Sequence, residues 1–153
     1  IKRRVKNSPL YGSPPLVGSA GGPRALKEVS SLVDRVEINS TARATRGGKI
    51  DLEIMATIDE GEIKAQIDLV KNVRPDIPVS MFLLVAVGEG KEVTKIKNSL
   101  RGGCLGNFMG PPEKVTENLA SLELLGIERI QLTEFFPGSH NLLSERLIGM
   151  NFN

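Results

Sequence analysis

The sequence predicts an α/β fold of parallel strand–helix units that amounts to about half of a TIM-type barrel. Segments of strand and helix character alternate along the chain, which is typical of a parallel sheet with helical crossovers. The segment from Pro78 to Val87 is almost continuously apolar, as expected of a strand that is covered on both faces. The 153 residues are 40% hydrophobic and 25% charged, which fits a single globular domain with a real core.

Four segments have strand character. They are Leu16 to Ser19, Arg35 to Ile38, Pro78 to Val87 and Ile127 to Leu132. A closed barrel of this class needs eight parallel strands, so four strands supply about half of one.

Segments with helical periodicity lie between these strands and after the last of them. The helical segments begin near Pro23, Asp59, Glu89, Pro111 and Asn141. The stretches 39–58 and 101–110 show no apolar periodicity, and we interpret both as loops. The first is long enough to belong to the loops that are usually functional or disordered.

Local signals mark some of the helix boundaries. Glu62 follows Asp59 by three residues, the spacing of a capping box. Gly126 stands where a helix stop is expected. In the first helical segment one face is apolar. That face consists of Leu26, Val29, Leu32 and Val33.

We divide the chain into an irregular lead-in, residues 1–15, and one domain, residues 16–153. The lead-in is rich in basic residues and proline and has no hydrophobic periodicity.

Composition excludes several classes of protein. A net charge of +2 and an aromatic content of 4% argue against a nucleic-acid-binding surface. The single cysteine, Cys104, excludes an internal disulfide and a cysteine-built zinc site. The longest apolar run, from Ile77 to Val87, is shorter than the roughly 20 residues that span a bilayer, and no signal peptide opens the chain. We therefore expect a cytoplasmic protein without metal, nucleic acid or membrane partner.

Three stretches, in this order, carry a resemblance to a known family. They are Leu16 to Val36 with its Gly21-Gly22-Pro23 turn, Ile58 to Val73, and Met109 to Ile130 with its Gly-Pro-Pro-Glu helix start. Together they resemble the C-terminal half of the bacterial-luciferase-like flavin- and deazaflavin-dependent oxidoreductases. The resemblance covers roughly residues 14 to 148. The stretch 39–58 looks most like the members that use the deazaflavin coenzyme F-420.

The resemblance implies a cofactor, either coenzyme F-420 or FMN. Family enzymes are about twice this length, and their N-terminal half supplies most of the substrate pocket and the usual catalytic side chains. No catalytic residue is therefore assigned to this chain. Three functions stay open: the cofactor-side half of an oxidoreductase, a non-enzymatic flavin- or phosphate-binding module, and a dimeric scaffold.

The candidate cofactor-binding residues are Gly18, Ser19, Gly21 and Gly22. They end a strand and open a helix, where free backbone N–H groups and the positive end of the helix dipole favour a phosphate. In the family, the matching turn lies beside the cofactor's phosphate. The alternative is that the glycines only make a tight turn between strand and helix.

Other polar residues carry weaker hypotheses. Arg43, Arg46 and Lys49 either close over an anion or belong to a solvated loop. We interpret Cys104 as a buried thiol, because no base is paired with it in the sequence. His140 is close to Glu134 and Ser139 in the sequence, but no oxyanion motif accompanies them, and we interpret it as a polar residue at the start of the last helix.

The partner that we expect is a second copy of the chain, giving a dimer; the resemblance also implies a missing N-terminal half. Four strands leave two open sheet edges. They also expose the inward face of the barrel, which we expect to be apolar and to include parts of Pro78 to Val87 and Ile127 to Leu132.

Overall fold

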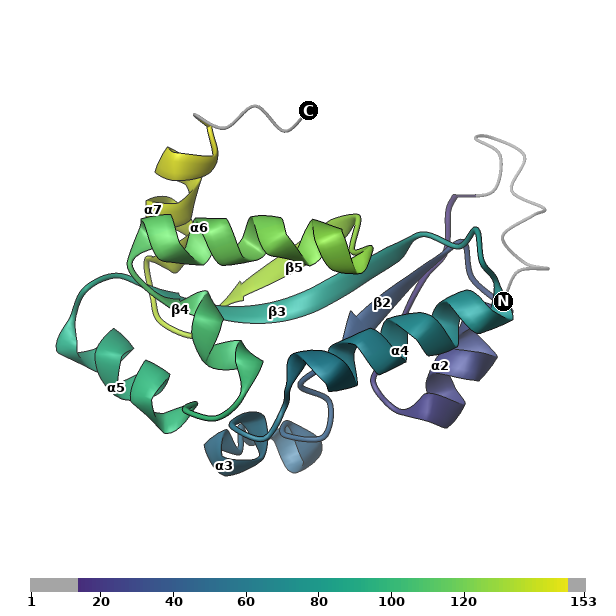
Figure 1. Ribbon diagram of the computed structural model, residues 1–153, viewed down its shortest axis with the longest axis horizontal. Helices are drawn as coiled ribbons and strands as arrows, with labels where there is room; N and C mark the ends of the chain where they lie inside the picture. Colours follow the sequence, from purple (N-terminus) through teal and green to yellow (C-terminus); the bar gives the residue numbers. More distant parts are fainter. Residues whose placement is uncertain (1–13, 149–153) are drawn as a thin grey trace.

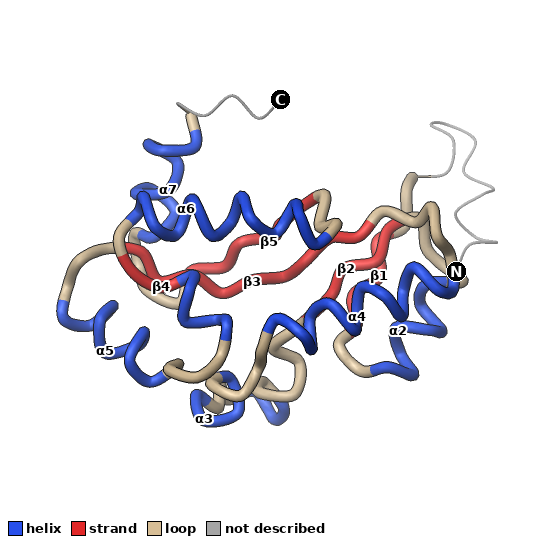
Figure 2. The backbone as a smooth tube through the Cα atoms, in the orientation of Figure 1, coloured by secondary structure: helices blue, strands red, loops and turns tan. Residues whose placement is uncertain are grey.

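Five strands form one parallel sheet in the computed structural model, which describes residues 14–148 (Figures 1 and 2). They are β1 (Val17–Ala20), β2 (Arg35–Asn39), β3 (Val79–Val87), β4 (Met109–Gly110) and β5 (Arg129–Glu134). β3 pairs with β2, with β5 and, at its carboxyl end, with the two-residue β4. The predicted parallel α/β fold is confirmed, and the four predicted strands all form.

The helices follow the predicted alternation. They are α2 (Pro23–Ser30), the short α3 (Leu52–Met55), α4 (Glu60–Val73), α5 (Lys91–Ser99), α6 (Pro112–Ser121) and α7 (Ser139–Leu147). Figure 1 shows α4 and α6 crossing the same side of the sheet, with α2 beside α4. No helix in the described part of the chain has both the length and the apolar character needed to cross a membrane.

The predicted apolar face of α2 is wrong at its end, because the helix stops before Leu32. Leu26 is fully buried, but Leu32 lies beyond the last helical residue and is 59% exposed. The helix ends at Ser30 because the chain must turn back to enter β2, and this turn carries Leu32 away from the core.

Both predicted loops contain short ordered elements. The stretch 39–58 holds the 3-10 turn η1 (Arg46–Gly48) and α3, whose N-cap Asp51 accepts a hydrogen bond from Ile54 N at 3.0 Å. The stretch 101–110 holds the 3-10 helix η2 (Cys104–Phe108) and β4. These elements are too short to show a periodic pattern in the sequence.

Strand β3 lies at the centre of the sheet and contributes the largest run of buried residues to the core. Every residue from Val79 to Val87 is buried except the half-buried Phe82. Val36 and Ile38 of β2 pair in register with Val79 and Met81 of β3. These four side chains and the following alternate residues of β3 therefore share one face of the sheet. The prediction of a strand covered on both faces is confirmed.

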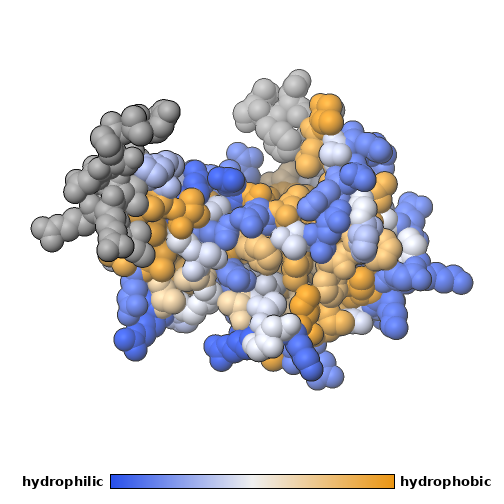
Figure 3. Space-filling view, turned by 180° about the vertical axis from the view of Figure 1, so that it is seen from behind, coloured by the Kyte–Doolittle hydropathy of each residue, from blue (hydrophilic) through white to orange (hydrophobic). Residues whose placement is uncertain are grey.

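The other face of the sheet is polar rather than apolar. The strand register aligns four side chains in one row across it, and these are Ser19, Glu37, Ser80 and Arg129. The next row carries Asn39, Phe82 and Gln131. Figure 3, which views the molecule from behind, shows hydrophilic and hydrophobic residues interspersed.

The expectation of an apolar inward face is therefore wrong for most of this surface. The apolar residues of β3 on this side, Leu84 and Ala86, are already buried within the chain, at 7% and 0% exposure.

The position of β3 gives a direct stability test. Leu83→Ala removes a fully buried side chain at the centre of the sheet, and we expect it to lower the free energy of unfolding by about 2–5 kcal/mol. Leu124→Ala, at a residue that is 89% exposed, serves as the control and should change stability by less than about 0.5 kcal/mol. Urea unfolding followed by circular dichroism measures both; equal effects of the two substitutions would contradict the position of β3 in the core.

Candidate functional site

The carboxyl ends of the parallel strands meet along one edge of the sheet. The segments that follow them are 21–22 after β1, 40–45 after β2, 88–90 after β3 and 135–138 after β5. Ligands of parallel α/β proteins bind at this edge, because helix N-termini and loops converge there. The predicted cofactor residues lie at its β1 end.

Two of the predicted site glycines are required by packing. A Cβ on Gly18 would lie 2.5 Å from Cγ1 of Val29, so a side chain there would push α2 away from β1. A Cβ on Gly21 would lie 2.4 Å from the Cβ of Ala42 and 2.5 Å from the carbonyl oxygen of Asn39. The alternative interpretation, a tight turn without a ligand, therefore explains these two residues.

Gly22 has no such packing role. A Cβ there would meet no atom within 4 Å, and its φ of −99° suits any residue. Gly22 is the N-cap of α2, where no side chain caps the helix and no acidic residue occupies the first turn. Pro23 contributes no N–H, so the first donors at this end are the N–H groups of Arg24 and Ala25. This helix end is open and electropositive.

Ser19 is exposed but lies on a different side of the sheet from Gly18. Gly18 packs under α2, and neighbouring residues of a strand point to opposite faces. Ser19 shares its row with Glu37 of β2. The structure therefore separates the four predicted residues into two packed glycines, one open glycine and one hydroxyl on the opposite face.

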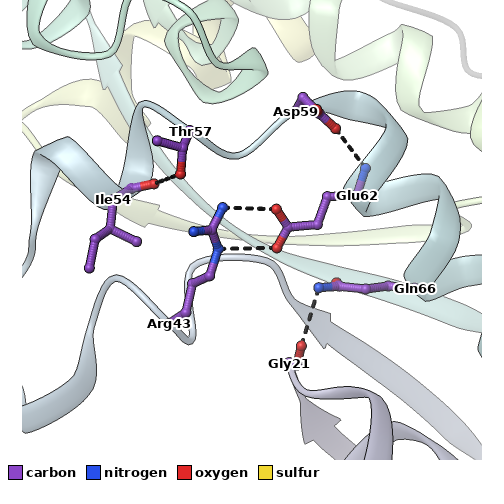
Figure 4. A network of polar contacts seen from close by, with 7 residues as sticks. All are labelled: Gly21, Arg43, Ile54, Thr57, Asp59, Glu62 and Gln66. Carbon is purple, nitrogen blue, oxygen red and sulfur yellow. Dashed lines mark hydrogen bonds and ion pairs between the residues drawn. The ribbon is translucent and has the colours of Figure 1, made fainter.

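Helix α4 fixes the loops at this edge (Figure 4). The guanidinium of Arg43 donates two hydrogen bonds to the carboxylate of Glu62, at 3.2 and 2.9 Å. One helical turn later, Gln66 Nε2 donates to the carbonyl oxygen of Gly21 at 3.2 Å. The turns after β1 and β2 are thus both tied to one face of α4.

This network corrects two predictions. Arg43 anchors its loop, whereas Arg46 and Lys49 are exposed around η1. The capping box is only half formed: Asp59 Oδ1 accepts from Glu62 N at 2.8 Å, but the Glu62 carboxylate is held by Arg43. Sequence reasoning missed Gln66, and the only available signal was its i, i+4 spacing from Glu62.

The end of β2 is also unusually polar. Ser40 and Thr41 are 2% and 0% exposed. Thr41 Oγ1 donates to Asn39 Oδ1 at 3.0 Å, whereas Ser40 Oγ and Gln66 Oε1 are buried without a hydrogen-bond partner among the described residues. Buried unpaired polar atoms cost free energy, so hydrophobic packing alone does not explain this corner.

The residues around His140 do not form a catalytic triad. The Ser139 hydroxyl is fully buried, accepts from Val87 N at 2.9 Å and donates to the Phe136 carbonyl oxygen at 2.5 Å. Glu134 accepts from the backbone N of His140 at 2.8 Å, and the imidazole Nδ1 lies 3.7 Å away. Ser139 therefore fixes the start of α7 against β3, which agrees with our interpretation of His140.

Cys104 lines a cavity of about 180 Å³ together with Ile63, Phe108 and Leu122. Burial raises the pKa of its thiol from 9.0 to about 11. Cys104 is half-buried, so the interpretation as a buried thiol holds only in part. Among residues 14–148, no three His, Cys, Asp or Glu side chains gather in a way that could hold a metal ion.

Comparison with known proteins shows the fold. No family model matches the chain, and no curated protein sequence matches it. Apo-MsnO8 superposes with a TM-score of 0.60 and 12% identity, over 94% of this chain and 54% of that chain. An F-420-dependent secondary alcohol dehydrogenase, in complex with an F-420–acetone adduct, gives a TM-score of 0.50 and 14% identity, over 88% and 48%.

The chain thus spans about half the length of the solved structures that it matches. The predicted α/β architecture, about half of a TIM-type barrel, is confirmed. At these identities the likeness concerns the fold alone.

The raised pKa of Cys104 predicts a pH dependence. Below pH 9 the thiol is protonated in both folded and unfolded chains; between pH 9 and about 11 only the unfolded chain loses the proton readily. The stability contributed by this group therefore falls as pH rises through that window. We expect the free energy of unfolding to fall more steeply with pH in the wild type than in Cys104→Ala. The variant lacks the thiol, and the contributions of all other groups cancel when the two proteins are compared. Equal slopes in chemical denaturation would contradict the burial of the thiol.

Proposed function

We propose that this chain is the cofactor-side half of a flavin- or deazaflavin-dependent oxidoreductase, and that it binds the cofactor at the carboxyl edge of β1. The observation that carries the proposal is the open N-terminus of α2 at Gly22. The fold supports it, because a solved structure of the same architecture is an F-420-dependent alcohol dehydrogenase in complex with an F-420–acetone adduct.

The residues at this edge fit a phosphate group, which both coenzyme F-420 and FMN carry. Gly22 leaves room for close approach, and the N–H groups of Arg24 and Ala25 supply donors at the positive end of the helix dipole. Gly21 and Gly18 contribute indirectly, since their missing side chains let the turn sit against β2 and α2.

The supporting network positions this turn. Gln66 holds the carbonyl oxygen of Gly21, and the Arg43–Glu62 pair holds the neighbouring loop, so the α2 N-terminus is fixed before a ligand arrives. The cofactor, when bound, supplies the hydride-transfer chemistry. The role proposed for this chain is to bind and orient the cofactor, and none of its side chains is assigned a catalytic step.

Substituting the open glycine tests the site. Gly22→Asp puts a carboxylate where the phosphate is proposed to bind, and we expect affinity for FMN or F-420 to fall at least about tenfold, equal to about 1.4 kcal/mol. The same change should leave the fold intact or slightly stabilise it, because aspartate is a better N-cap than glycine. Fluorescence titration measures the affinity, and thermal unfolding measures the stability.

Gly22→Ala is the matched control, because its Cβ enters open space and carries no charge. The proposal requires that Gly22→Ala keep most of the affinity. Equal affinities of Gly22→Asp and wild type would refute the site. Absence of binding by the wild type would favour the scaffold function, and binding without hydride transfer, even with a complementary N-terminal half added, would favour a non-enzymatic binding module.

A further inference from the structure

We infer that two copies of this chain close into one eight-strand parallel barrel, with β5 of one copy paired against β1 of its partner. The inference concerns the two open edges of the sheet and does not depend on cofactor binding.

Both outer strands have one unpaired edge among the described residues. β1 pairs with β2, and β5 pairs with β3. Each therefore leaves a row of backbone N–H and C=O groups without a sheet partner, which is a template for further pairing. All strands run in the same direction, so β1 of a second copy can extend the sheet beyond β5 without a change of polarity.

An exposed leucine lies at the end of α2, the helix that follows β1. Leu32 stands in the turn after the last residue of α2 and is 59% exposed. Ala25 of α2 is exposed as well, whereas Val29 packs against Gly18 of β1.

The β5 edge carries an apolar groove. It has a volume of about 530 Å³ and lies between α6, β5 and α7. Its apolar lining includes Leu119, Ile127, Ile130, Leu132 and Leu147. One edge of the chain thus presents a protruding leucine and the other a groove of matching chemistry.

The charges near the polar face are also balanced. Arg35 and Arg129 are matched in number by Glu37 and Glu128, and Arg35 already lies 3.6 Å from Glu128. Closing two copies around this face would bury as many acidic as basic groups, a condition for burying charge in a protein interior. Because these charges balance, this face has no net charge that would attract a strongly acidic or a strongly basic partner.

The strand count selects a second copy as the occupant. Barrels of this class close with eight parallel strands, and β1, β2, β3 and β5 supply four. Two-fold closure uses both open edges of both copies, so assembly stops at two chains. The two solved structures above are about twice as long as the part that this chain matches.

Light scattering coupled to size exclusion, over a dilution series, tests the inference. The wild type should have twice the monomer mass of 16.6 kDa. Leu32→Glu places a charge in the apolar contact and should raise the dimer dissociation constant at least about tenfold. Ile50→Glu, at a residue that is 43% exposed in the stretch 39–58, is the control and should stay dimeric. Circular dichroism checks that each variant is folded.

If Leu32→Glu fails to fold, Val17→Lys at the β1 edge, where Val17 is 52% exposed, replaces it with the same expected loss of dimer. A wild type that stays at the monomer mass throughout, or that grows beyond two copies, would overturn the inference. So would equal dissociation constants for Leu32→Glu and Ile50→Glu. Because no cofactor is present, these outcomes are independent of the proposed cofactor site.

Discussion

The pairing of β3 on both of its sides is the constraint on which the rest of the structure depends. This strand bonds to β2 along its first half, to β5 over most of its length and to β4 at its end. Helices α4 and α6 cross the sheet on the same side and cover one of its two faces. The carboxyl ends of the strands then come together at one edge, and that edge contains the candidate site.

Much of this architecture could be predicted, because the responsible signals are local. A nearly continuous apolar run marks β3, and Asp59 marks the start of α4, where it accepts the predicted bond from Glu62 N. Features set by tertiary contact could not be predicted. Leu32 fits the helical period of the apolar face, yet the helix ends before it and the turn into β2 exposes it. Arg43 looks like a free cation in the sequence, because nothing local shows that Glu62 holds it.

The glycine-rich turn shows how far sequence reasoning reaches at the site. The same motif contains residues with different physical roles: Gly18 and Gly21 permit close packing, and Gly22 leaves a helix end open. A sequence does not distinguish these roles, because glycine is the common solution to both requirements. Of the three glycines, only Gly22 has no packing role, so the candidate site is narrower than the motif that predicted it.

Hydrogen exchange in the presence and absence of coenzyme F-420 or FMN tests the central claim, that the carboxyl edge of β1 is the functional edge of this half-barrel. The account predicts slower exchange at the amides of Arg24 and Ala25 when the cofactor is bound, because these N–H groups then donate to its phosphate. Amides at the opposite edge, such as that of Arg35, should not change. Protection at the opposite edge, with Arg24 and Ala25 unchanged, would contradict the account.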